Sequence, residues 1–205
     1  MSSLLLRGFA LGFAIAASPG PIFFLCLRRT LLRGRLYGIV SGLGVATADA
    51  FYATVAAFGF AVVVAAVVSG RRPLAVVGGA VLIGLGLRIL FARQNRPAEA
   101  PVTTGRGFAW AYASTFGLTI TNPATIISFA ALAATLGLGG GGGLAKPAAL
   151  VAGVLIGSAT WWCLLAVAAS FMRTRLTPTV VRGISTFSGL AIAVLGMLAI
   201  YSAFS

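Results

Sequence analysis

The residues of this chain whose types and spacing could do chemistry lie inside long apolar segments. The first such site is a helix-breaking run, Ser18, Pro19, Gly20 and Pro21. A proline has no backbone N–H, so the two prolines deprive the carbonyls of Ile15 and Ala17 of their helical partners. An unpaired carbonyl is costly in hydrocarbon, and the break must therefore face protein or a watery cavity. Exposed backbone groups of this kind can bind an ion or a polar solute.

A second break lies in the fourth apolar segment, at Thr121, Asn122 and Pro123. Pro123 frees the carbonyl of Thr119, and the neighbouring side chains add hydroxyl and amide groups at the same depth. One break alone could be a packing kink. Breaks in corresponding segments of two halves are typical of transporters that bind substrate near the middle of the membrane. We therefore predict that both breaks form a substrate-binding site.

Asp49 is the acidic residue that lies within an apolar segment. Gly38 and Gly42 precede it at helical spacing, so it shares a helix face with residues small enough for close packing. Burial disfavours the charged form of a carboxyl group, so Asp49 could carry a proton or bind a cationic substrate. The alternative is a structural ion pair with an arginine such as Arg88.

Three further side chains are candidates for lining the cavity. Thr47 and Tyr52 lie near Asp49 in the sequence, although a tyrosine at such a position is more often a packing residue. Trp161 and Trp162 lie well inside the fifth segment, which argues against anchoring at the membrane surface. Trp161 could offer a cation–π face, and packing is the alternative interpretation.

The composition places these residues in a membrane protein. The chain has 205 residues, of which 60% are hydrophobic and 8% charged, whereas soluble domains carry about 25% charged residues. The 15 basic and 2 acidic residues give a net charge of +13, but the arginines fill the gaps between apolar segments, which argues against nucleic acid as a partner. There is no histidine, and Cys26 and Cys163 lie in apolar segments. We expect no cofactor, no metal site and no enzymatic activity.

Six apolar segments are long enough to cross a bilayer, at about 4–27, 37–68, 73–92, 108–136, 147–171 and 180–204. The first could be a cleaved signal peptide, but its apolar character continues too far. A polar linker at about 93–107 separates two halves. The prediction is one all-α integral membrane domain over 1–205, in which repeat 1 covers about 4–92 and repeat 2 about 108–204.

The two halves resemble each other in their glycine spacing. Arg72, Gly79, Leu85 and Gly86 match Arg182, Gly189, Leu195 and Gly196. Because each half has three segments, the second half enters the membrane from the opposite side, which makes the repeats inverted. The first, third and fifth connections hold ten basic residues, and the other side holds four. The odd connections are therefore predicted to be cytoplasmic and both termini outside.

These motifs, taken in order, resemble the lysine exporter (LysE/RhtB-type) family. They are Ser18–Pro21, Gly42 to Asp49, Thr119 to Pro123, Gly153 to Trp162, and Ser188 to Gly196. The resemblance implies a six-helix inner-membrane exporter of amino acids or related small metabolites, driven by proton exchange. By this resemblance, the two breaks of the family correspond to Pro19, Gly20, Pro21, Asn122 and Pro123. Asp49 matches an acidic position that is found in some branches of the family. Ala124 stands where many members carry lysine, which puts the substrate in doubt.

The resulting prediction is a secondary transporter in the inner membrane, with a small molecule and the lipid bilayer as its partners. A homodimer is left open. A channel or efflux protein without proton coupling is the alternative function. A membrane enzyme or thiol relay is disfavoured because the two cysteines are far apart in sequence.

Overall fold

The computed structural model describes residues 2–58, 71–91, 105–136, 144–173 and 177–204. Within these ranges every regular element is an α-helix, which confirms the all-α prediction. The helices are α1 (Ser2–Ala17), α2 (Pro21–Arg33), α3 (Arg35–Ala57), α5 (Arg71–Phe91), α6 (Gly105–Ile120), α7 (Pro123–Leu136), α8 (Ala145–Arg173) and α9 (Pro178–Phe204). The end of the predicted segment 37–68 and most of the predicted linker 93–107 lie outside the described residues.

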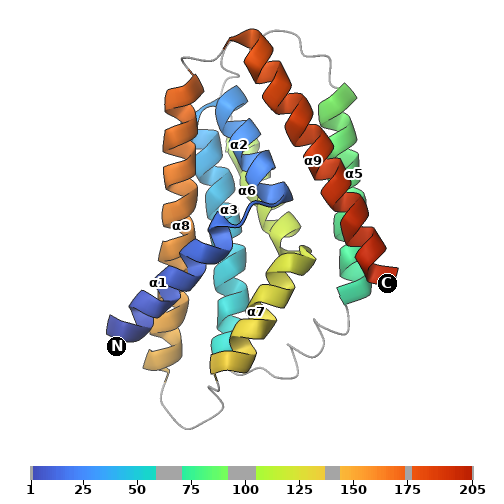
Figure 1. The fold of residues 1–205 in the computed structure, drawn as a ribbon. Coiled ribbons are helices and arrows are strands. Elements are labelled where there is room, and N and C mark those ends of the chain that lie inside the picture. The colour runs from blue at the N-terminus through green and yellow to red at the C-terminus, as the bar shows by residue number, and fades with distance from the viewer. Residues whose placement is uncertain (1, 59–70, 92–104, 137–143, 174–176, 205) are drawn as a thin grey trace.

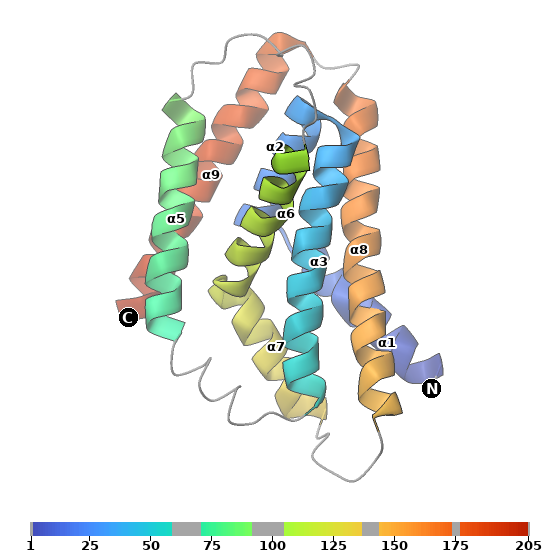
Figure 2. The ribbon, with the colours of Figure 1, turned by 180° about the vertical axis from the view of Figure 1, so that it is seen from behind.

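The helices run between two ends of one bundle (Figures 1 and 2). Of the described helices, α3, α5, α8 and α9 are each long and apolar enough to cross a membrane, and the bent pair α1–α2 is a fifth candidate. The pair α6–α7 connects the same two ends with helices of 16 and 14 residues. Both termini lie at one end of the bundle (Figure 1). The chain is thus a multi-pass helical protein with four or five candidate spans, and the count of six stays a prediction.

The two breaks occur where the prolines predict them. At the first, α1 and α2 meet at 79°. At the second, residues 121 and 122 separate α6 from α7. Both breaks lie about midway between the ends of the bundle (Figure 1).

The first connection differs from the sequence-based expectation. The segment containing Arg28 and Arg29 is helical, because α2 continues to Arg33 and only Gly34 separates it from α3. Gly34 has φ 97°, a conformation that glycine adopts at little cost. The Arg29 guanidinium donates from Nη1 to Ala111 O (3.0 Å) and Ser41 Oγ (3.2 Å), and from Nη2 to Ser114 Oγ (2.8 Å). The arginine can therefore lie in the bundle, where it ties α2 to α3 and α6.

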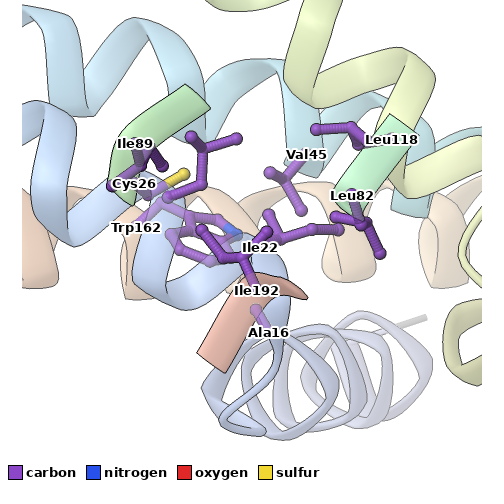
Figure 3. Close-up of a cluster of buried hydrophobic side chains, with 10 residues drawn as sticks. Ala16, Ile22, Cys26, Val45, Leu82, Ile89, Leu118, Trp162 and Ile192 are labelled. Carbon is purple, nitrogen blue, oxygen red and sulfur yellow. The ribbon is translucent and has the colours of Figure 1, made fainter. Parts of the chain in front are cut away.

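A buried hydrophobic cluster joins both breaks to the rest of the bundle (Figure 3). It contains Ala16, Ile22, Leu25, Cys26, Val45, Leu82, Ile89, Leu118, Trp162 and Ile192. Ala16 and Ile22 flank the first break, and Leu118 lies just before the second. The two breaks consequently border one shared core.

Candidate functional site

The first break leaves an uncapped helix start. Gly20 is the N-cap of α2, with extended φ −144° and ψ −174°, and no side chain caps the helix. The N–H of Phe24 donates to Gly20 O (3.4 Å), and the N–H of Ser18 donates to Ile15 O (3.2 Å). The expectation of a free Ile15 carbonyl is therefore wrong, because α1 tightens its last turn. Among the described residues, none accepts the N–H of Ile22 or Phe23.

The second break is closed by its own groups. The Asn122 side-chain oxygen accepts from the N–H of Ala124 (3.1 Å), and Pro123 occupies the first helical position, a common start for a helix. The N–H of Asn122 donates to Thr119 O (3.1 Å), so the expectation of a free Thr119 carbonyl is also wrong. The Tyr52 hydroxyl donates to Ile120 O. Side chains of Asn122 and Tyr52 thus bond backbone groups at the second break. At the first break, no side chain caps the start of α2.

Asp49 lies in the interior, where it pairs with a serine. Its side chain is 2% exposed, and Oδ2 accepts a hydrogen bond from Ser158 Oγ at 2.7 Å. This bond joins α3 to α8 in the middle of the bundle. Arg88, the alternative partner, has an exposed side chain. In the described part of the chain, Asp49 forms no ion pair, and Ser158 is its hydrogen-bond partner.

Sequence reasoning missed Ser158. The signal was a hydroxyl beside Gly157, in an apolar segment whose small residues resemble those before Asp49. That signal gives no partner, because 109 positions separate the two residues.

The three candidate lining residues face different neighbours. The Thr47 hydroxyl lies 2.7 Å from the Tyr112 hydroxyl of α6, on a different face of α3 from Asp49. Tyr52 is buried beside the second break, and its ring stacks on Phe129 (5.9 Å between centroids). The half-buried Trp161 places its ring 5.3 Å from Phe13 of α1. The structure therefore brings Tyr52 to a break and leaves Thr47 away from Asp49.

The residues of the breaks are accessible to different degrees. Ser18 and Pro19 are exposed, whereas Gly20, Pro21, Thr121 and Asn122 are half-buried. A Cβ atom placed on Gly20 would meet nothing within 4 Å. The first break thus has open space at the start of α2.

Four buried polar atoms have no hydrogen-bond partner in the described structure: Arg28 Nε, Trp161 Nε1, Trp162 Nε1 and Ser188 Oγ. Trp162 is 3% exposed and packs on Gly42 of α3. Buried donors of this kind are rare, because each loses its bonds to water without replacement. Trp162 is a buried member of the core shared by the breaks, and the half-buried Trp161 packs against that core.

Replacing Tyr52 with phenylalanine should destabilise the second break. The variant keeps the ring on Phe129 but leaves Ile120 O without its donor. An unsatisfied buried acceptor costs about 1–3 kcal/mol. We expect a lower thermal midpoint in detergent and faster amide hydrogen exchange in residues 120–126. Leu36→Ala, an exposed position on the same helix, should change neither. Unchanged exchange at the break in the Tyr52 variant would contradict this role.

Comparisons with known proteins agree with this architecture. A family model described as LysE type translocator matches residues 13–203. YahN, an uncharacterized membrane protein of Escherichia coli (strain K12), is 30% identical over 114 residues. That match covers 55% of this chain and 51% of the relative, so the chain spans about half the length of that protein. No solved structure matches the chain.

Proposed function

Because the chain belongs to the family of LysE type translocators, which are transporters and not enzymes, we propose that it exports amino acids or related small solutes across the inner membrane in exchange for protons. The observation that carries this proposal is the buried Asp49–Ser158 pair. An ionisable group inside a membrane bundle is costly to keep and typically marks an ion or substrate path. Asp49 has no cationic partner in the described structure, which leaves its carboxyl group to bind a proton or the ammonium group of a substrate.

The proposed mechanism is competition for one carboxyl group. A proton and a cationic substrate cannot both occupy Asp49, so loading one releases the other. Ser158 holds one carboxylate oxygen, which fixes the direction in which the other oxygen can accept a proton or bind an ammonium group. The residues of both breaks, from Ser18 to Pro21 and from Thr121 to Pro123, would line the substrate path, with Tyr52 at its wall.

The proposed architecture has six spans in two inverted repeats. Reciprocal contacts between α5 and α9 support it. A Cβ on Gly79 would lie 2.7 Å from Gly196 O, and one on Gly86 would lie 2.7 Å from Gly189 O. The sequence match pairs Gly79 with Gly189 and Gly86 with Gly196. Exchanging the two halves by a two-fold rotation therefore converts the Gly79–Gly196 contact into the Gly189–Gly86 contact. Likewise, α1 packs on α8 and its counterpart α6 packs on α3.

The proposed orientation puts both termini outside. The end of the bundle opposite the termini carries Arg33 and Arg35 at the α2–α3 junction, Arg106 at the start of α6 and Arg182 near the start of α9. The end with the termini carries Arg7, Arg71, Arg72 and Lys146. The ten basic residues of the odd connections, against four on the other side, support a cytoplasmic location for the former end.

Transport by the purified protein tests this function. Proteoliposomes would contain an equimolar mixture of the standard L-amino acids and stand in the same mixture at equal concentration, and net release would be followed by mass spectrometry with and without an imposed pH gradient. We expect selective release of one or a few amino acids that the gradient drives against their concentration. Release that only follows the concentration gradient would instead indicate a channel. No release above that of protein-free vesicles would reject amino-acid export.

A further inference from the structure

The first turn of α2 carries backbone donors that the described residues do not satisfy. The N–H groups of Ile22 and Phe23 have no acceptor there, and Gly20 supplies no capping side chain. The contrast with α7 is direct, because Asn122 caps that helix. The start of a helix also bears a partial positive charge from the aligned peptide dipoles. Together, free N–H groups and this charge favour an anion.

A second donor lies beside this helix start. Trp162 is 3% exposed, and its Nε1 has no acceptor in the described structure. Trp162 and Ile22 belong to the same buried cluster. Figure 3 shows the indole nitrogen on the edge of the ring that faces Ile22. A side chain on α8 and the backbone of α2 thus present donors to one region, and both lack acceptors.

The surroundings leave room for a ligand and define its other end. A Cβ on Gly20 would meet nothing within 4 Å, so there is space beside the helix start. Ser158, which holds Asp49, lies one helical turn before Trp162 on α8. The Asp49 carboxyl group therefore contacts α8 one helical turn from Trp162.

We propose that the start of α2 and the indole N–H of Trp162 form a carboxylate-binding subsite for the exported solute, opposite Asp49. The inference rests on the proposed export function and deepens it, because it assigns Trp162 as a specificity-determining residue. The groups that define this subsite, the N–H groups of Ile22 and Phe23 and the indole N–H of Trp162, are donors, and a carboxylate is an acceptor only. The subsite should therefore prefer amino acids over their amides, while Asp49 binds the ammonium group that both compounds share.

Indole NMR tests the subsite without relying on transport. The protein would be labelled with ¹⁵N-tryptophan in detergent, and the Trp162 signal would be assigned with the Trp162→Phe variant. We expect the L-amino-acid mixture to move the Trp162 N–H signal downfield and the corresponding amides to leave it in place. The N–H signal of the exposed Trp110 should shift with neither mixture. An unmoved Trp162 signal, or equal shifts with acids and amides, would overturn the proposal.

Exchange assays supply the second measurement. In Trp162→Phe the affinity for the transported amino acid should fall about 10- to 100-fold, as expected for loss of one hydrogen bond to a charged group, with the affinity for its amide unchanged. Trp110→Phe, the same substitution on the exposed surface, should alter neither. Equal losses for acid and amide would make Trp162 a packing residue and refute the subsite. A shifted Trp162 signal in a protein that exports nothing would reject the export function and keep the subsite.

Discussion

Replacing Asp49 with asparagine is expected to abolish gradient-driven export while leaving the bundle folded. Asparagine has the shape of aspartate, and its amide oxygen can still accept the hydrogen bond from Ser158 Oγ. It cannot take up or release a proton, and it has no charge to attract an ammonium group. In proteoliposomes with an imposed pH gradient, net release by Asp49→Asn should fall to the level of protein-free vesicles.

Ser158→Ala is the matched control, because it removes the partner and keeps the carboxyl group. Loss of one hydrogen bond to a charged group costs about 1.5–3 kcal/mol, so this variant should lose affinity and still respond to the pH gradient. The thermal midpoints of both variants in detergent should show that the fold survives. If Asp49→Asn transported as much as the wild-type protein, Asp49 would have no role in proton coupling. The family to which the chain belongs would not be affected by that result.

The positions of the helix breaks could be predicted from sequence because their causes are local. A proline removes its own N–H and obstructs the preceding turn whatever surrounds it. Asn122 followed by Pro123 is likewise a local start signal for a helix. The hydrogen bonds that the freed carbonyls accept could not be predicted in the same way. The backbone N–H groups of Ser18 and Asn122 reach the carbonyls of Ile15 and Thr119 only after the chain has turned.

The partners inside the bundle depend on tertiary structure. Nothing near Asp49 in the sequence indicates Ser158, and nothing near Arg29 indicates the carbonyl of Ala111, which is 82 positions away. Charge alone suggested that Arg29 lies in a connection. The contacts of its guanidinium explain why the helix can continue through it. A sequence pattern can thus predict how deep in the bundle a polar residue lies. Its binding partner depends on the helix that faces it.

Replacing Gly12 with alanine is expected to destabilise the protein by separating α1 from α8. A Cβ on Gly12 would lie 2.7 Å from Val154 Cα and 2.8 Å from Val154 C. Both are backbone atoms, so no side-chain rotation relieves the overlap. Overpacking of this kind typically costs about 1–3 kcal/mol. Because α1 carries the first break, the displaced helix should also impair transport.

Gly84→Ala separates this steric effect from the general effect of removing a glycine. Gly84 lies within α5, and a Cβ there would meet nothing within 4 Å. Alanine is the better helix former by about 1 kcal/mol, so Gly84→Ala should leave the thermal midpoint unchanged or raise it, while Gly12→Ala lowers it. Equal midpoints in the two variants would mean that α1 and α8 can separate freely. In that case close packing between α1 and α8 could not be what holds the first break in the shared core.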